Sequence, residues 1–332
     1  MKKLLTIMLV VVMATAMISC ADEGVIVWDY MNLDSPAHPA IAFLNEWSNE
    51  IYERTDGRFR INIRVGGELP FTTSEYIEVV SNGLVEMAGA MITAVAPSLR
   101  AGSLPALPFM ITNTESFHAV MNVLEQYLNE ELAEWGVFNA MTLFYPYQEI
   151  SGSGPAPSNY GDLAGLRLRT TGAQQARFWH EVGMIPTSID AAEVSSALNT
   201  RIIDAVTTAN MALHTNRWYE SLDWIYVCNQ MFIPVYVVVN NAAWNRLPAD
   251  IQDVFMEVTA NFVATFPERM VAASHESLAV MEAGGLEVIQ ASEEDRLALR
   301  NIAIPLWEEF ARANGPNAER ALAEIKAALN IE

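Results

Sequence analysis

The residue whose type and position best suit chemistry is Arg169, which ends a short hydrophobic strand just before a glycine turn. It lies in the stretch from Asp162 to Asp204, which continues through a helix-periodic run and a second strand–helix unit. A guanidinium donates two parallel hydrogen bonds to a carboxylate and keeps its charge when it is desolvated. The stretch therefore predicts a site for a small anion at a strand end.

No sequence pattern for a catalytic or metal centre accompanies this arginine. The chain has no glycine-rich phosphate loop ending in Lys-Ser/Thr, no HExxH zinc helix, no GxSxG nucleophile elbow and no cysteine pair spaced for a metal. Its histidines are scattered singly, and His38, close behind the first predicted strand, is better placed near a cleft than the others. The sequence predicts a binding protein that is not an enzyme, with no cofactor and no recognisable metal ligands, and it leaves open whether a metal ion assists ligand binding.

Composition narrows the class of molecule further. The 332 residues are 52% hydrophobic and 18% charged, which allows a large core, and this length favours two lobes over one. The formal net charge is -21, from 19 Lys and Arg against 40 Asp and Glu. Phosphate backbones are bound by basic surfaces, so we expect no nucleic acid partner.

The amino terminus predicts export. After two lysines, the apolar run Leu4 to Ile18 has the layout of a secretory signal and is short for a membrane span. Ser19 and Cys20 follow this run and resemble a bacterial lipobox. We therefore expect residues 1–20 to be a lipoprotein signal peptide. Cys20 would carry a lipid anchor in the extracytoplasmic cell envelope. Plain signal cleavage with an incidental cysteine is the alternative. Cys228, in an apolar segment, is predicted to be a small buried hydrophobe.

Strands and helices alternate through the first half of the chain. Strand-like and helical periodicities predict, in order, strand 25–30, helix 36–54, strand 58–65, helix 74–84, strand 85–92, a loop at 93–97, helix 116–135 and strand 140–145. Such units favour a mostly parallel sheet covered by helices. Residues 152–159, GSGPAPSN, are predicted to be either a domain hinge or a surface loop.

The last third of the chain is predicted to be helical. Apolar residues repeat at helical spacing from Pro248 to Phe266, and Pro267 predicts a kink in one long helix. Ser292 and Asp295 have the spacing of a capping box for another helix, and residues 318–329 are predicted to form the last one.

The stretch from Asp162 to Asp204 resembles the signature of the TRAP-type, DctP-like solute-binding proteins. That signature reads roughly D-L-K-G-L-K-x-R, a helix, a G-A-x-P turn and E-x-Y-x-A-L-Q-x-G-x-x-D-G. The matching positions are Leu163, Gly165, Leu166, Arg169, Gly183, Pro186, Glu193, Ala197, Leu198 and Asp204. Three further segments are similar to the family in the same order and extend the likeness over most of the mature chain: 66–69, 107–109 and 240–248.

The resemblance implies a periplasmic-binding-protein-like α/β fold with two lobes, a central cleft, crossing strands and a long bracing helix. We expect the binding protein to span 21–332, with the first lobe at about 24–145 plus later crossing segments, the second at about 146–240, and helices in 248–332 bracing both. The resemblance also implies capture of a small organic acid and its delivery to the small and large membrane subunits of an ion-driven TRAP permease.

The family's conserved arginine, matched by Arg169, implies a bidentate salt bridge to a ligand carboxylate. Gln148 and Glu149 stand where relatives carry a second arginine or a glutamine, so we expect a monocarboxylate, bearing an amine or hydroxyl, rather than a dicarboxylate or acidic sugar. Thr208 stands at the family's carboxylate-binding asparagine. Asn210, two residues on, is a second candidate for that hydrogen bond.

Four more pocket positions follow from the resemblance, and three of them have a structural alternative. Asn32 follows the first strand, where relatives place a polar ligand contact, or it is a turn residue. Met91 would make one wall of the pocket apolar. Trp218 and Phe232 stand where relatives have aromatic groups near the cleft, or they belong to the core. Arg167 is predicted to lie on the opposite face of its strand, at the surface.

Two other functions remain open at this stage. One is a ligand-sensing binding protein that signals to a membrane receptor kinase, and the other is an exported enzyme on the same fold. Adjacent genes for a small and a large membrane protein would favour transport. The enzyme would require a nucleophile and a base in the cleft, and the sequence offers no such pair.

Overall fold

The computed structural model describes residues 24–331, and its sheet contains two parallel halves. In the first half β1 pairs in parallel with both β2 and β3. These strands are β1 (Ile26–Met31), β2 (Phe59–Arg64) and β3 (Met87–Met91). The accompanying helices are α2 (Pro39–Arg54), α3 (Tyr76–Ser81), α4 (Ile92–Val95) and α5 (Thr114–Glu134). We call these elements the first lobe.

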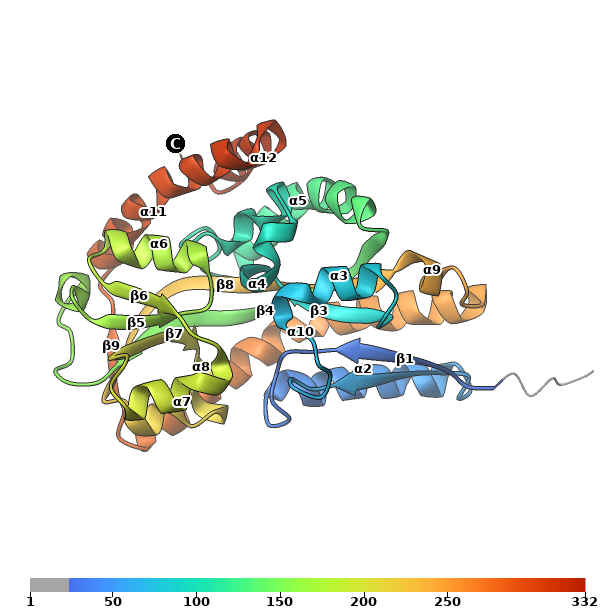
Figure 1. The fold of residues 1–332 in the computed structure, drawn as a ribbon, viewed down its shortest axis with the longest axis horizontal. Helices are drawn as coiled ribbons and strands as arrows, with labels where there is room; N and C mark the ends of the chain where they lie inside the picture. The colour runs from blue at the N-terminus through green and yellow to red at the C-terminus, as the bar shows by residue number, and fades with distance from the viewer. Residues whose placement is uncertain (1–23, 332) are drawn as a thin grey trace, which may run out of the picture.

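The second half repeats the strand–helix design. Its central strand β5 pairs in parallel with β6 and β7. The strands are β5 (Arg167–Thr170), β6 (Ile185–Ser188) and β7 (Ala205–Ala209). The helices that follow them are α6 (Ala173–Glu181), α7 (Ala191–Asn199) and α8 (Asn210–Thr215). We call these elements the second lobe, which lies at the left of Figure 1 with the first lobe at the right.

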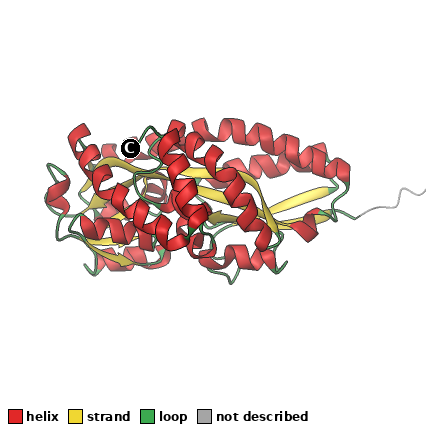
Figure 2. Ribbon diagram, turned by 90° about the horizontal axis from the view of Figure 1, so that it is seen from above, coloured by secondary structure: helices red, strands yellow, loops and turns green. Residues whose placement is uncertain are grey.

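Two long antiparallel strands run between the lobes (Figure 1). β4 (Val137–Gly152) and β8 (Trp224–Asn240) pair with each other; β8 also pairs with β3 in the first lobe, and β4 with β7 in the second. The sheet order is therefore β2-β1-β3-β8-β4-β7-β5-β6, with β9 (Glu287–Gln290) beside β8. β8 is a nearly continuous apolar run that is buried at almost every position, as expected for a strand covered on both faces. Helices surround the strands of the sheet in Figure 2.

These crossing strands correct two expectations. The strand predicted at 140–145 is too short, because its alternating pattern is interrupted after Tyr145 while pairing resumes at Gln148 and continues to Gly152. Residues 152–159 are thus a loop that follows β4, and the connection between the lobes is a pair of strands. The loop predicted at 93–97 is also wrong in part, since it contains most of the short helix α4.

The C-terminal third is helical, as predicted. After α9 (Asn241–Trp244), α10 (Ala249–Ala283) runs 35 residues without a break at Pro267 and packs against α2, β4 and α8, so it contacts both lobes. α11 (Glu293–Asn314) packs on α6, and α12 (Pro316–Ala328) packs on α5. The capping box is half correct: the Ser292 hydroxyl accepts the Asp295 N–H at 3.0 Å, but the Asp295 carboxylate accepts the Tyr226 hydroxyl.

Packing around this framework completes the predicted fold. Apolar clusters lie on both faces of the sheet, and Cys228 is fully buried in one of them. Burial raises the pKa of the Cys228 thiol well above its ordinary value. Within residues 24–331, no helix is both long and apolar enough to cross a membrane. The chain has the α/β architecture of periplasmic solute-binding proteins, with two lobes, crossing strands and a bracing helix.

Candidate ligand-binding cleft

The carboxyl ends of the parallel strands in the two lobes border one cleft. In the first lobe Asn32 follows β1 and Thr93 lies two residues beyond β3, while in the second lobe Thr171 follows β5, Asp190 follows β6 and Asn210 follows β7. Parallel strands bring their carboxyl ends to the same edge, where α/β proteins commonly bind ligands. The topology therefore builds a site from short turns contributed by the two parallel halves of one sheet.

A cavity of about 560 Å³ occupies part of this cleft. Hydroxyl and amide groups dominate its polar lining, and Asp190 is its only charged side chain. The lining residues come from both lobes and from α11: Thr72, Thr73, Ser74, Thr93, Ala94, Ala96, Pro97, Ala106, Thr171, Gly172, Ala173, Gln174, Gln175, Asp190, Phe310 and Asn314. None of the nine residues predicted to touch the ligand lines this cavity.

The lobes meet at one side of the cavity. A Cβ atom placed on Gly172 would lie 2.7 Å from the carbonyl oxygen of Thr93, which is closer than side chains pack. Gly172 has extended backbone angles, with φ at −170°, so the close approach and not an unusual conformation requires glycine there. The Thr93 hydroxyl, on a side chain only 8% exposed, has no hydrogen-bond partner within residues 24–331.

Arg169 is buried at the second-lobe side of the cleft, with 5% of its surface exposed. Its Nε donates to the carbonyl of Ile189 at 2.8 Å and its Nη1 to that of Thr207 at 3.4 Å, while the guanidinium carbon lies 5.5 Å from the centre of the Trp218 ring. In the part of the chain that the structure describes, no carboxylate pairs with this guanidinium and no hydrogen bond involves Nη2. The side chain is held in place and keeps donor capacity.

Burial sets the electrostatics of this arginine. Desolvation lowers the pKa of Arg169 to about 10, and the nearby Asp190 carboxylate opposes that shift. The guanidinium therefore remains charged at neutral pH. Arg167, two residues earlier on β5, is exposed as predicted and pairs with Asp204 through contacts of 2.6 and 2.8 Å. One strand thus carries a surface arginine with an acid partner and a buried arginine without one.

Comparison with known proteins accords with this architecture. Residues 31–314 match the family described as bacterial extracellular solute-binding protein, family 7, also called DctP. The chain belongs to this family. It is a DctP-like solute-binding protein of the TRAP type, as its Asp162–Asp204 signature predicted.

Several relatives of this DctP-like protein share most of its length. The C4-dicarboxylate-binding periplasmic protein DctP of Vibrio cholerae is 22% identical over 91% of this chain and 92% of the relative. A monocarboxylate 2-oxoacid-binding periplasmic protein of Nostoc sp. is 25% identical over 80% of this chain and 73% of its own. The crystal structure of DctP7, a Bordetella pertussis extracytoplasmic solute receptor binding pyroglutamic acid, has a TM-score of 0.83 at 18% identity, covering 90% of this chain and 99% of that one.

Three predicted residues lie on the strands next to Arg169. Thr208 on β7 pairs directly with Glu149 on β4, and Gln148 pairs with Ala209. Glu149 is 1% exposed; its Oε2 accepts the N–H groups of Cys228 at 2.7 Å and Asn229 at 2.9 Å. Its Oε1 has no partner among the described residues. Gln148, Glu149 and Thr208 are therefore close to one another, and contact with a ligand stays a prediction for each.

Asn210 and Asn32 occupy opposite lobes of this DctP-like protein. Asn210 begins α8 and is 2% exposed; its Nδ2 donates to the Ser274 hydroxyl of α10 at 3.3 Å, and its Oδ1 has no partner within residues 24–331. Asn32 uses its Oδ1 to accept the Asp34 N–H at 2.6 Å, which favours the turn alternative for this side chain. Nearby, His38 is buried and accepts the Ala40 N–H at the start of α2.

The apolar candidates divide between core and cleft. Phe232 is buried and stacks on Phe144, with ring centres 5.0 Å apart, which favours the core alternative. Trp218, in the short 3-10 helix Trp218–Ser221, packs in the second-lobe core, and its ring lies against the guanidinium of Arg169. Met91 ends β3, half-buried. Cys20 lies outside the described residues.

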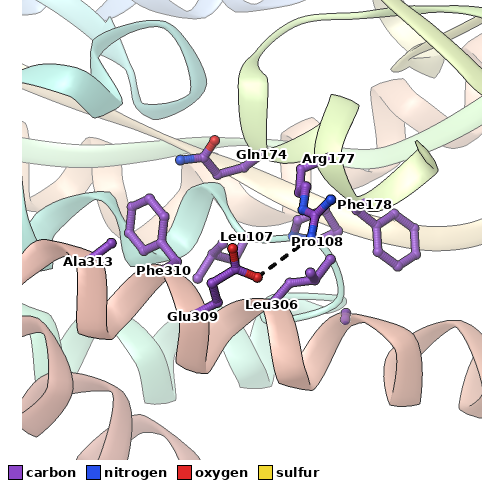
Figure 3. Close-up of a pocket in the computed structure, with 10 residues that line it drawn as sticks. Leu107, Pro108, Gln174, Arg177, Phe178, Leu306, Glu309, Phe310 and Ala313 are labelled. Atoms are coloured by element: carbon purple, nitrogen blue, oxygen red, sulfur yellow. Dashed lines mark ion pairs between the residues drawn. The ribbon is translucent and has the colours of Figure 1, made fainter. Parts of the chain in front are cut away.

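A second cavity of about 200 Å³ adjoins the first, and the two share Gln174 and Phe310 (Figure 3). Its walls are mostly apolar and come from α6, α11 and the Leu107–Pro108 segment. Arg177 of α6 and Glu309 of α11 lie across it, 3.7 Å apart (Figure 3). This cavity separates the second lobe from the C-terminal helix that covers it.

Sequence reasoning missed the residues that line the larger cavity, above all Thr93, Gly172 and Asp190. Each stands just beyond the end of a parallel strand, and that position is itself a signal, because strand ends at one sheet edge share a crevice. The signal is usable for Thr93 and Gly172, because the sequence predicts one strand that ends at residue 92 and another that ends at Arg169. It is weaker for Asp190, because no bounds are predicted for the strand before it.

Proposed function

We propose that this DctP-like protein is a receptor that captures a small organic carboxylate in the cleft between its lobes. The observation that carries the proposal is Arg169, a buried guanidinium that lacks a carboxylate partner in the described chain and retains an unbonded Nη2. An unpaired buried charge is costly, and a ligand carboxylate would compensate it. Thr208 or Asn210 would supply a neighbouring hydrogen bond.

We further propose a single carboxylate on the ligand. The larger cavity is lined by no lysine or arginine, and its one charged side chain, Asp190, would repel a second carboxylate. Its hydroxyl and amide groups suit a ligand body that carries hydroxyl or amine groups. Glu149 adds an acidic group at a position where the resemblance places a second arginine or a glutamine in relatives. It therefore offers no partner for a second carboxylate.

Delivery to a TRAP permease completes the proposal. Solute receptors of known structure share this fold. We expect the closed, ligand-bound receptor to dock on the small and large membrane subunits. Lobe closure around a ligand is the usual motion of binding proteins. Nothing in this pathway requires chemistry on the solute, so we assign the protein no enzymatic activity.

The first test is a thermal-shift screen of organic acids followed by calorimetry on Arg169 variants. Arg169→Ala should weaken binding of the best acid by at least about 2–3 kcal/mol, and Arg169→Lys should recover little, because an ammonium cannot form the bidentate pair. Unchanged affinity in both variants would remove Arg169 from the site. A dicarboxylate that stabilises the protein more than monocarboxylates do would refute the single-carboxylate assignment.

The lipid anchor is proposed from the lipobox-like Ser19-Cys20 sequence. Fractionation of cells that express the full chain should place the wild-type protein with membranes and release Cys20→Ser into the soluble fraction. A single acyl signal binds membranes reversibly, whereas several chains on one cysteine hold a protein firmly. Equal membrane association of both proteins would argue against the anchor.

A further inference from the structure

The ladder between the crossing strands has its largest register shift at one level, between the two lobes. Gln148 of β4 pairs with Met231 of β8, but the next pair is Ile150 with Tyr226, so residues 227–230 of β8 lie opposite Glu149 alone. Backbone pairing is therefore lost where the strands pass from one lobe to the other. Rotation of one lobe relative to the other breaks the fewest hydrogen bonds at a level where β4 and β8 are not paired.

Backbone conformations mark the same level. Tyr147 on β4 and Asn229 on β8 have φ values of 54° and 52°, in the left-handed region that non-glycine residues seldom occupy. Phe109 also has a positive φ, of 60°, and its N–H donates to the carbonyl of Gln230 at 2.8 Å. The two crossing strands and the segment at Phe109 thus carry unusual backbone angles at this level. We take this level as the hinge.

Glu149 bridges the interruption. Its Oε2 accepts two N–H groups from the bulged strand, at Cys228 and Asn229, so one carboxyl replaces the missing ladder bonds. Its Oε1 is fully enclosed and has no donor among residues 24–331. A carboxylate needs donors on both oxygens to offset its burial, whereas a neutral carboxyl is much less costly to enclose. Only one of the two carboxyl oxygens therefore has the donors that the ionised form requires.

We infer that Glu149 is a proton-binding site within the hinge, and that the closed cleft favours its neutral form while ionisation favours opening. Bending at Tyr147 and Asn229 would separate the strands and admit water to Oε1, which would relieve the cost of the charge. The inference concerns lobe motion and needs no ligand, so its failure would leave the proposed carboxylate site intact.

The surroundings of Glu149 agree with this balance. Burial raises its pKa to about 8, and the opposing influences are the two N–H bonds from β8 and the charge of Arg296 on α11. The other titratable groups that face it are Tyr147 on its own strand and the Cys228 thiol on β8, and β7 contributes the uncharged Thr208. Ionisation would therefore occur within the pH range in which the folded protein can be studied.

The test is small-angle X-ray scattering of the exported chain between pH 6 and pH 9, after any co-purified ligand has been removed by unfolding and refolding. The radius of gyration of the wild-type protein should rise as the pH increases through this range. Glu149→Gln should remain compact throughout, because glutamine can accept both N–H groups through its oxygen and cannot ionise. Glu131→Gln, which removes a buried carboxylate that lies within one lobe, should keep the wild-type transition.

Arg296→Gln provides a second variant in case Glu149→Gln does not fold. It removes the positive charge that favours ionised Glu149 in the closed form, so the rise in radius at high pH should be larger than in the wild-type protein. A radius independent of pH in the wild-type protein would overturn the inference. So would an unchanged transition in Glu149→Gln, or a rise in Arg296→Gln that is no larger than that of the wild-type protein.

Discussion

Two buried glutamates differ in how completely the protein surrounds them. Glu131 on α5, inside the first lobe, accepts the N–H groups of Arg100, Ala101 and Gly102 at 2.8–3.1 Å, using both of its oxygens. Glu149, between the lobes, accepts two N–H groups on one oxygen and leaves the other without a donor. The buried carboxylate inside one lobe thus has donors on both oxygens, whereas the one at the proposed hinge has donors on only one.

Arg169 extends the comparison to positive charge. It is as buried as Glu131, yet it has carbonyl partners and no acidic partner in the described chain. Glu131 is thus fully hydrogen-bonded without a ligand, while Glu149 and Arg169 keep an unused acceptor and an unused donor. Burial alone therefore does not identify a functional polar group. Hydrogen-bonding capacity that a buried group leaves unused is the more informative sign.

The largest expected effect is on stability, at Glu131. Glu131→Gln should lower the free energy of unfolding by about 3 kcal/mol, because either orientation of the amide turns its NH2 group toward backbone N–H groups. Urea denaturation would measure this loss, with the exposed Glu134→Gln as the control. Glu149→Gln should cost clearly less, since one amide oxygen can accept both N–H groups. Equal losses for the two buried glutamates would break the comparison.

An intermediate effect is expected at the contact between the lobes. Gly172→Ala places a methyl group against the Thr93 carbonyl and should weaken ligand binding by about 1–2 kcal/mol, as for other overpacked contacts. Gly172→Ser adds at least as much bulk but also supplies a hydroxyl that can cap α6. Comparing the two variants therefore separates the effect on the contact between the lobes from the effect on helix stability. Gly24→Ala, with no atom near the added group, is the control for calorimetry. Unchanged affinity in both Gly172 variants would show that the contact is not needed for binding.

The smallest effect is expected at Arg167. Arg167→Ala should leave ligand affinity unchanged and lower stability only slightly, because exposed ion pairs contribute little. The pair holds the pKa of Asp204 below its ordinary value, so its contribution is present above about pH 4 and is lost as the pH falls through the lowered value. Urea unfolding at pH 7 and pH 3 would measure it. A loss of binding would contradict the division of roles on β5.

Glu149 gives the opposite pH dependence of stability. Its pKa is raised in the folded state, so the folded protein binds more protons than the unfolded chain between about pH 4 and pH 8. The associated stability is fully present below that range and is lost as the pH rises through about 8. Subtracting the Glu149→Gln profile from that of the wild-type protein would isolate this contribution.

Much of the fold was predictable from the sequence, because it depends on local periodicity and on one specific signature. The strand–helix alternation of both lobes, the long C-terminal helix and the family were predicted from such patterns. The crossing strands were less predictable: the bulge around Pro146 and Tyr147 interrupts the alternation of β4, and pairing partners 80 residues apart leave no local signal.

The site was predictable in kind but less so in detail. Arg169 could be singled out because a charged residue ending an apolar strand is unusual and matches the family signature. The partners of Glu149 could not be predicted, because the bulge in β8 exists only through three-dimensional pairing. Thr93 and Gly172 come close together only when the two lobes meet, and no spacing in the chain encodes that approach.

The position of β8 has a consequence for how the chain acquires its structure. This strand lies beside β3, so the sheet of the first lobe is completed by residues up to Asn240, and α10, which covers the same lobe, follows later still. The amino-terminal lobe therefore cannot finish folding while only its own segment has emerged. Such long-range pairing slows folding, so we expect the amino-terminal lobe to complete its structure only when the segment that contains β8 and α10 is available to it.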